Sequence, residues 1–496
     1  MSSLVLLDHV DKVRRTVAAA TRREHKSELG QFMTPSAVAR FMASLFADND
    51  VKTARLLDAG AGVGSLTSAF LDRWSNGGFG FSHVNVTAYE IDRHLLGHLD
   101  NALSAHAGHL PLDWSIHAED FIEDAVNALQ FGLPAGGRHT HAILNPPYKK
   151  IGSHSNHRLL LRHLGIETVN LYSAFVALAL SLLTQGGQLV AIVPRSFCNG
   201  PYYRPFREFI LARAALRHLH LFAARNRAFR DDGVLQENII LLLEKGTDQG
   251  NVTVSQATDG DFADLETDIV PFERIILADD PEQCIHIPTS RQIDPIKDSS
   301  AFRHSLADIG IEVSTGPVVD FRLREHLRDV PEAGTVPMLY PCHFSGGVLT
   351  WPKAEARKPN ALMRNADTEK WLYQNGYYTV VRRFSSKEER HRIVASVASP
   401  RAIDSPVLGF ENHLNVFHCD KRGIPEEMAH GLATYLNSTI VDRHFRRFSG
   451  HTQVNVADLR RMKFPPRDAL LALGRWAMAV GAPTQEEIDR KVEDMA

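Results

Sequence analysis

The stretch Leu56-Leu57-Asp58-Ala59-Gly60-Ala61-Gly62-Val63-Gly64 predicts the fold of the first half of the chain. A short apolar strand ends at Asp58, and alternate glycines then lead into a helical stretch. Glycine has no Cβ, so the backbone at Gly60 and Gly62 can pass close to a bound ligand. Such a loop is typical of a nucleotide cradle, although the same pattern can simply pack a helix on a strand.

Short apolar strands alternate with helical stretches on both sides of this loop, up to about residue 245. The predicted strands are Ala54–Asp58, Val84–Glu90, Ala142–Asn145, Gln188–Pro194, Leu216–Phe222 and Asn238–Glu244. The apolar run from Tyr172 to Leu183 is too short to span a bilayer and predicts a buried helix. This alternation predicts an α/β fold with a mainly parallel sheet covered by helices on both faces. Ligands of such sheets bind at the carboxyl ends of the strands.

Two carboxylates lie at the ends of neighbouring predicted strands. Asp58 precedes the first glycine, and Glu90 ends the next strand in Ala88-Tyr89-Glu90-Ile91-Asp92. A carboxylate at the second position can accept hydrogen bonds from both hydroxyls of a ribose. Glu90 by itself is also consistent with a solvated strand end. The loop and the two acids together favour a nucleoside-containing ligand.

The tetrapeptide Asn145-Pro146-Pro147-Tyr148 directly follows a predicted strand. Two prolines make this exit rigid and extended, and they remove N–H donors from it. The Asn145 side-chain oxygen and the Pro146 carbonyl can therefore accept both hydrogens of an amino group, whose nitrogen can then attack a sulfonium methyl. Tyr148 offers a face for a stacked base, at about 1–3 kcal/mol per base. A proline-rich turn without chemistry is the alternative, but chance rarely produces these four residues together.

These motifs, in this order, resemble those of the gamma-group N6-adenine DNA methyltransferases of type II restriction–modification systems, the Taq and Pst type. The resemblance implies a Rossmann-like domain that binds S-adenosylmethionine. Residues 30–35 resemble the N-terminal cofactor motif, and residues 58–64 resemble the glycine motif. The expected cofactor-binding residues are Thr34, Pro35, Asp58, Gly60, Gly62, Glu90, Ile91, Asp120, Phe121 and Asn145.

The resemblance also assigns the reacting end of the site. Residues 145–148 correspond to the catalytic motif, so Asn145, Pro146, Pro147 and Tyr148 are the expected catalytic residues. Lys149 is expected to hold the flipped strand. Phe229 is a loose match to the second stacking aromatic of the family, and core packing is an equal alternative.

The second half of the chain resembles the target-recognition half of Pst-type enzymes. The matching stretches are Val313–Arg322, Arg382–Arg390, Glu411–His418 and Arg446–Asn455. We therefore expect an N-terminal helix (1–29), a catalytic domain (30–250), a mixed target-recognition domain (251–465) and a helical tail (466–496).

Local clusters of basic and amide side chains are the expected DNA contacts, because the formal net charge of the whole chain is only -3. Arginine and amide side chains can read base edges, while arginine and lysine hold phosphates. A solvated charged face is the alternative. The candidates are Arg382, Arg383, Lys387, Arg446, Arg447, His451, Gln453 and Asn455.

The expected function is site-specific N6-methylation of a flipped-out adenine in double-stranded DNA, without a metal. The expected setting is the host-protecting half of a restriction–modification system, whose cognate endonuclease is encoded separately. Four widely spaced cysteines and the lack of a signal peptide predict a cytoplasmic, nucleoid-associated bacterial or archaeal protein without a membrane partner.

Other functions remain open from the sequence alone. The amino-methylating alternatives act on cytosine N4, on RNA or on a protein glutamine. A catalytically silent DNA-specificity protein is the alternative from a different class, and the intact tetrapeptide at 145–148 argues against it.

Overall fold

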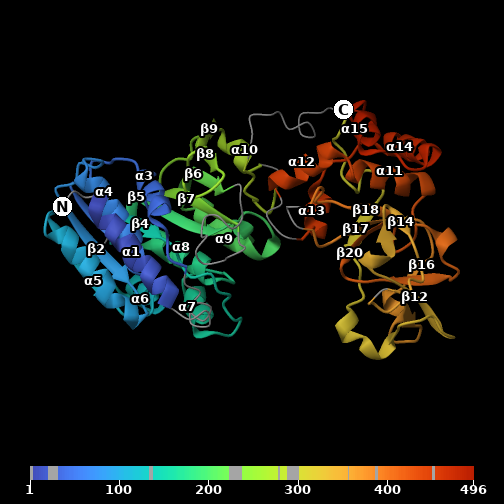
Figure 1. Ribbon diagram of the computed structural model, residues 1–496, viewed down its shortest axis with the longest axis horizontal. Coiled ribbons are helices and arrows are strands. Elements are labelled where there is room, and N and C mark those ends of the chain that lie inside the picture. Colours follow the sequence, from blue (N-terminus) through green and yellow to red (C-terminus); the bar gives the residue numbers. More distant parts are fainter. Residues whose placement is uncertain are drawn as a thin grey trace. The chain divides into compact units, whose positions relative to one another are not determined.

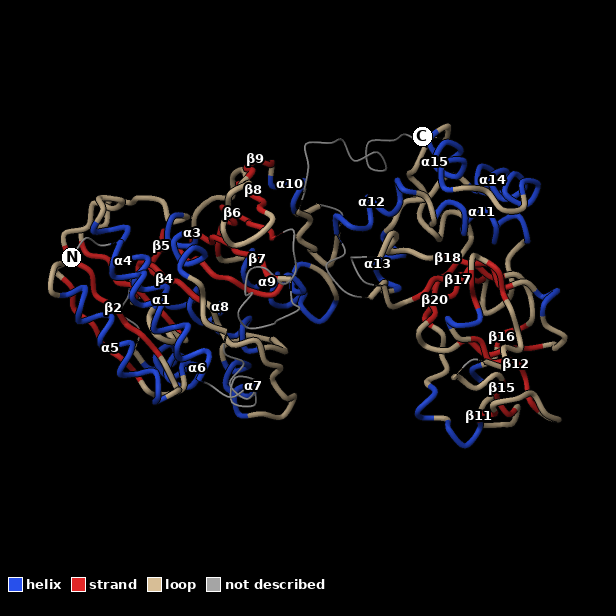
Figure 2. Tube along the Cα trace, viewed as in Figure 1, coloured by secondary structure: helices blue, strands red, loops and turns tan. Residues whose placement is uncertain are grey.

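The computed structural model describes residues 4–20, 32–132, 138–222, 237–277, 280–287, 301–355, 357–385, 389–448 and 453–495. The chain divides into two compact units, Met1–Thr289 and Ser290–Ala496. Figure 1 labels their helices and strands, and Figure 2 marks the strands in red.

The first unit is built on a nine-stranded sheet in the order β3-β2-β1-β4-β5-β7-β6-β8-β9. Neighbouring strands from β3 to β5 run parallel, whereas β7 is antiparallel to both β5 and β6. The predicted α/β fold with a mainly parallel sheet is thus confirmed. The strands are β1 (Thr53–Ala59), β2 (His83–Tyr89), β3 (Leu112–His117), β4 (His139–Leu144), β5 (Leu183–Pro194), β6 (Ala214–Phe222), β7 (Asn238–Lys245), β8 (Val252–Ala257) and β9 (Glu266–Val270).

Helices cover both faces of this sheet. Successive strand residues point to opposite faces, so each face carries apolar side chains that the helices bury. In β7, Ile239 and Leu241 join one apolar cluster, and Ile240 and Leu242 join the other. The first cluster includes α6 (Phe121–Phe131), α8 (Leu171–Leu182) and α9 (Arg204–Leu211), and the second includes α3 (Ser36–Ser44), α4 (Ser65–Ser75) and α5 (Arg93–Ala107). Helix α1 (Leu4–Ala20) packs beside α4 and α5.

The first unit extends beyond the boundary expected at residue 250. Strand β8 pairs in parallel with β6, β9 pairs with β8, and the short helix α10 (Phe272–Ile275) follows. Neither strand was predicted from the sequence. Strand β9 forms the edge of the sheet and β8 lies beside it. Because β9 is largely exposed, it lacks the apolar run of a central strand. The polar stretch after residue 250 therefore belongs to the catalytic sheet and not to the second unit.

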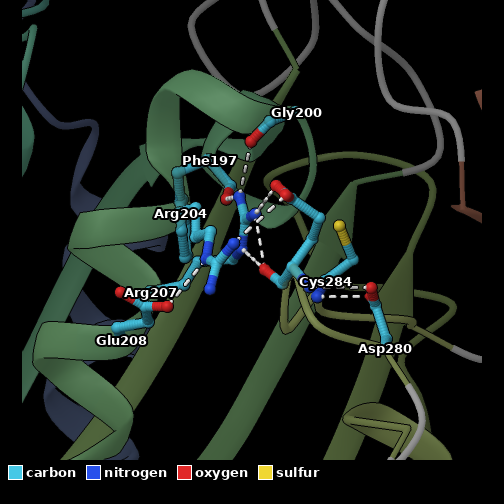
Figure 3. A network of polar contacts seen from close by, with 8 residues as sticks. Phe197, Gly200, Arg204, Arg207, Glu208, Asp280 and Cys284 are labelled. Atoms are coloured by element: carbon cyan, nitrogen blue, oxygen red, sulfur yellow. Dashed lines mark hydrogen bonds and ion pairs between the residues drawn. The ribbon is translucent and has the colours of Figure 1, made fainter. Parts of the chain in front are cut away.

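A buried arginine fixes the segment that leaves the carboxyl end of β5 (Figure 3). Arg207 of α9 is fully buried and donates to the carbonyl oxygens of Phe197 (2.9 Å) and Gly200 (3.0 Å). It also donates to the Glu282 carbonyl, from Nη2 at 2.7 Å and from Nε at 3.0 Å. The Arg207 guanidinium thus ties α9 to the loop at Phe197 and Gly200 and to Glu282, and Arg204 of the same helix adds a 3.5 Å ion pair with Glu282.

The second unit contains two larger sheets, in the orders β10-β20-β17-β18 and β11-β15-β12-β19-β16. Helices α11 (Glu426–Leu436) and α14 (Arg467–Val480) cross so closely that a Cβ on Gly474 would lie 1.7 Å from the Glu427 carbonyl oxygen. The tail expected at 466–496 therefore packs into this unit as α14 and α15 (Gln485–Glu493).

The remaining strands and α-helices described in the second unit are short, and the longest is α12 with 10 residues. They are β10 (Glu312–Thr315), β11 (Leu327–Arg328), β12 (Thr335–Leu339), β13 (Phe344–Ser345), β14 (Val348–Leu349), β15 (Ala361–Met363), β16 (Tyr373–Gln374), β17 (Tyr378–Arg382), β18 (Ala395–Ala398), β19 (Val407–Phe410), β20 (Leu414–His418), α12 (Thr439–Phe448) and α13 (Val456–Arg461). Across the described ranges of both units, no helix combines the length and the apolar character that crossing a bilayer requires.

Candidate active site

A cavity of about 290 Å³ lies where β1, β2 and β4 of the first unit end. This is the sheet edge at which ligands of parallel sheets bind. Eight of the ten expected cofactor-binding residues line it: Thr34, Gly60, Gly62, Glu90, Ile91, Asp120, Phe121 and Asn145. Pro147 and Lys149 line it as well, so the cavity reaches from the expected cofactor residues to the tetrapeptide.

The glycine loop and Glu90 form one wall through backbone hydrogen bonds. Gly60 and Gly62 have φ values of 81° and 60°, in the left-handed region that favours glycine. Gly62 donates its N–H to Glu90 Oε2 at 2.8 Å, and Asp92 donates to Oε1 at 2.8 Å. Glu90 is only 3% exposed, yet it lines the cavity. The carboxylate thus lies at the cavity wall, held by the backbone of the glycine loop and of Asp92.

Asp58 lies beneath the glycine loop and does not line the cavity. Its Oδ2 accepts a 2.6 Å hydrogen bond from the Thr67 hydroxyl of α4, while Oδ1 has no partner among the residues that the structure describes. Burial raises the pKa of this carboxyl to about 7. The sequence placed Asp58 in direct contact with the cofactor, but the structure places it behind the cavity wall.

The Asp120-Phe121 pair opens α6 at the opposite wall. Asp120 is the N-cap of the helix and accepts the backbone N–H groups of Ile122 (2.8 Å) and Glu123 (3.3 Å). Its other oxygen, Oδ2, is 3.0 Å from Nε2 of His157 on α7 (Asn156–His163). Phe121 is buried against Phe175, with ring centroids 4.9 Å apart, and both rings line the cavity.

The side-chain amide of Asn145 has a fixed orientation. Its Nδ2 donates to the Phe32 carbonyl oxygen (2.5 Å) and to Thr34 Oγ1 (3.0 Å). A carbonyl oxygen can only accept, so the amide nitrogen must face Phe32. Asn145 Oδ1 therefore points away from these partners as an acceptor, and it receives the Tyr148 hydroxyl at 3.1 Å.

Tyr148 is half-buried beside Asn145. Its hydroxyl also lies 3.1 Å from the Ile192 carbonyl of β5, and burial raises its pKa. The ring packs 5.8 Å from the Phe32 ring, measured between centroids. Pro35 and Pro146 lie next to lining residues without lining the cavity themselves. Pro35 is the N-cap of α3, and Lys149 is exposed.

Several lining residues were not predicted from the sequence, among them Phe32, His157 and Phe175. Phe32 lies within residues 30–35, the stretch that resembles the N-terminal cofactor motif, so its position was a usable signal. Phe175 was hidden in the apolar helix α8. His157 lies outside every motif, and only the packing of α7 on α6 brings it to the cavity.

The expected DNA-binding residues of the second unit are partly engaged within it. Arg446 donates to Asp442 Oδ2 (2.5 Å) and to the Glu389 carbonyl (2.8 Å), and Arg382 pairs with Glu389. Asn455 caps α13 together with Asp458. Arg383 Nη2 donates to Gln453 Oε1 at 3.3 Å. Phe229, Lys387, His451 and the Arg447 side chain lie outside the described residues.

Two curated relatives match almost the whole chain. The type II methyltransferase M.BsuBI of Bacillus subtilis is 51% identical over 495 residues, which cover 99% of this chain and 98% of the relative. M.PstI of Providencia stuartii, also a type II methyltransferase, is 42% identical over 93% of this chain and 92% of its own length. The family model of the Eco57I restriction-modification methylase matches residues 90–229.

Solved structures support the architecture. A DrdV–DNA complex aligns with 96% of this chain and 59% of its own, at a TM-score of 0.54 and 12% identity. The type IIL restriction-modification enzyme MmeI, solved with DNA, aligns with 100% of this chain and 75% of its own, at a TM-score of 0.51 and 10% identity. These structural similarities show a shared fold. The two relatives that match almost the whole chain also show the family. The protein belongs to the type II methyltransferases of restriction–modification systems, together with M.BsuBI and M.PstI.

Proposed function

We propose that this methyltransferase transfers a methyl group from S-adenosylmethionine to the N6 amino group of an adenine in double-stranded DNA. The observation that carries the proposal is the fixed orientation of Asn145, whose side-chain oxygen is presented as an acceptor beside a nucleotide-sized cavity. The prolines that follow have no N–H group, so the Pro146 carbonyl adds a second acceptor without a competing donor. Two acceptors match the two hydrogens of an exocyclic amine.

The residues of the cavity fit S-adenosylmethionine. Glu90 is placed to accept the ribose hydroxyls, because its carboxylate lies at the end of β2 beside the glycine loop. Ile91, which is 54% exposed, and Phe121 offer apolar surface to an adenine ring. Asp58 Oδ1, which has no hydrogen-bond partner among the described residues, lies behind the same loop, and the ionised carboxylate favours a positive charge in front of it.

The chain's own groups would position and polarise the substrate amine. When bound, S-adenosylmethionine supplies a methyl group on a cationic sulfur that leaves as a neutral thioether. Asn145 Oδ1 and the Pro146 carbonyl would hold the two N–H groups, which frees the nitrogen lone pair from the aromatic ring for in-line attack. Tyr148 would stack on the base. These contributions come from orientation and fixed dipoles, and the methylated nitrogen then releases a proton to solvent.

DNA as the substrate is supported by membership of the family. The N6 group takes part in base pairing, so the adenine would have to leave the duplex before it meets Asn145. We assign target recognition to the second unit, with Gln453 as a candidate base reader and Arg383, which donates to it at 3.3 Å, as a candidate phosphate contact. Arg446 and Asn455 have internal partners, which favours a structural role for both. A separately encoded endonuclease would be the functional partner.

The test compares Asn145→Ala with Thr34→Val in the full-length enzyme. Asn145→Ala removes one acceptor and is expected to lower kcat by about 100-fold or more, equivalent to about 2–4 kcal/mol in the transition state. Thr34→Val removes one of the two groups that hold the amide nitrogen, so its loss should be smaller. In Asn145→Ala, cofactor affinity measured by calorimetry should change far less than kcat.

The base is identified from the product. Digestion of methylated DNA followed by mass spectrometry should reveal N6-methyladenine. The same acceptors could serve cytosine N4, so N4-methylcytosine as the only product would refute the adenine assignment. Near wild-type turnover of Asn145→Ala would refute its catalytic role.

A further inference from the structure

His157 and Asp120 form a polar pair at the wall of the cavity that also carries Phe121. The distance from His157 Nε2 to Asp120 Oδ2 is 3.0 Å, and the side chains are 30% and 27% exposed. We propose that His157 is a positioning residue that orients the Asp120 carboxylate toward the 6-amino group of the cofactor's adenine. This inference rests on the proposed function, because it assumes that the cavity binds an adenosine compound.

The hydrogen bonds that Asp120 makes with described residues leave room for one further donor. A carboxylate has about four lone-pair positions. The two backbone N–H groups of α6 occupy Oδ1, and His157 occupies one position of Oδ2. The remaining position is on Oδ2, the oxygen that His157 holds in place. An amino group is a complementary ligand for it, whereas a carbonyl oxygen is not.

A second contact fixes α7 so that His157 stays on Asp120. Ser155 caps α7 by accepting the N–H of Arg158 at 3.3 Å. Asn156, the residue before His157, donates from Nδ2 to Glu123 Oε1 of α6 at 3.0 Å. The Asn156–Glu123 contact also joins α7 to α6, but it does not involve Asp120. The chain thus supplies a matched control for a role that is purely structural.

The electrostatics of the pair are consistent with an oriented carboxylate. The hydrogen bond with Asp120 raises the pKa of His157, and the hydrogen bond and charge of His157 lower the pKa of Asp120 in spite of its burial. The other charged groups nearby are Glu123, which also acts on His157, and Glu119 and Lys149, which line the cavity. Asp120 therefore remains an acceptor at neutral pH.

The experiment measures two affinities for each variant by calorimetry. The ligands are S-adenosylhomocysteine and its inosine counterpart, in which an oxygen replaces the 6-amino group. The wild type should prefer the adenine compound by roughly tenfold or more, because it forms one hydrogen bond to a charged acceptor. His157→Ala and His157→Phe should reduce this ratio to about threefold or less, since neither side chain can donate to Asp120.

Two further variants separate positioning from packing. His157→Gln should retain the ratio, because the glutamine amide nitrogen can take the place of Nε2. Asn156→Ala should retain it even if both affinities fall. The ratio compares two affinities of the same variant, so partial destabilisation of the fold does not change it. If His157→Ala fails to fold, His157→Phe keeps an aromatic ring at this position and remains available for the test.

Several outcomes would overturn the inference. An unchanged ratio in His157→Phe would show that the pair only ties α7 to α6. A wild type that binds both ligands equally would show that Asp120 does not face the amino group, while the proposed function would stand. A wild type that binds neither ligand would instead refute the proposed cofactor.

Discussion

Asp58 shows how a single buried carboxyl can link the stability of this protein to pH. Burial raises its pKa to about 7, whereas an aspartate in an unfolded chain titrates near 3.9. Between these values the folded protein holds a proton that the unfolded chain has lost. Stability therefore falls as the pH rises from about 4 to about 7, because the folded state binds more protons over this window.

Asp58→Asn should remove this contribution without a change in side-chain size. The amide is always neutral, so the variant should be as stable as the wild type near pH 4 and more stable at pH 8. Thermal unfolding without cofactor, followed between pH 4 and pH 8, provides the measurement. Asp50→Asn, the same substitution at an exposed position, serves as the control. Parallel curves for Asp58→Asn and the wild type would contradict the assigned titration.

Among the elements, α9 is hydrogen-bonded to two other segments through the buried guanidinium of Arg207. Arg207 satisfies three carbonyl oxygens from residues 197, 200 and 282. Removing a buried charged donor leaves those acceptors unsatisfied, so Arg207→Ala should lower the free energy of unfolding by about 3 kcal/mol or more. Arg207→Lys should recover only part of this loss, because an ammonium group cannot reproduce the planar fork.

The neighbouring Arg204→Ala is the matched control for this measurement. Arg204 lies on the same helix, pairs with Glu208 at 2.7 Å and lies 3.5 Å from Glu282 Oε1, but its side chain is 43% exposed, so both ion pairs are partly solvated (Figure 3). Chemical denaturation should show little change for it. If Arg207→Ala changed the free energy of unfolding as little as Arg204→Ala, the hydrogen bonds of Arg207 would contribute nothing to the stability of the fold.

The elements that sequence reasoning found are those with a strong local signal. The six predicted strands and the buried helix are present in the structure, and the glycine loop lies at the sheet edge as expected. Strand β3 was missed because polar and apolar residues alternate in it, and strand β9 was missed because most of its residues are polar. His157 and Phe175 could not be identified, because their places at the cavity follow from helix packing and not from a motif. Arg446 belongs to a basic cluster in sequence, yet its partners lie inside its own unit.

For the whole molecule, the division into two units predicts which fragment can fold and bind cofactor. Every residue that lines the cavity lies between positions 32 and 175, and the sheet that supports it continues to β9. A fragment of residues 1–289 should therefore fold and bind S-adenosylmethionine with an affinity close to that of the full chain. It should not methylate the specific site, because it lacks the unit to which we assign recognition.

The fragment 1–250, cut at the boundary that the sequence suggested, is the informative comparison. It lacks β8, which pairs with β6, and the Glu282 carbonyl that accepts from Arg207. We expect it to be much less stable than 1–289 and to bind cofactor weakly or to aggregate, since β6 would become an exposed edge. Calorimetry and thermal unfolding of both fragments decide the question. Equal stability would show that β8 and β9 are dispensable additions, and selective methylation by 1–289 would show that site recognition does not require the second unit.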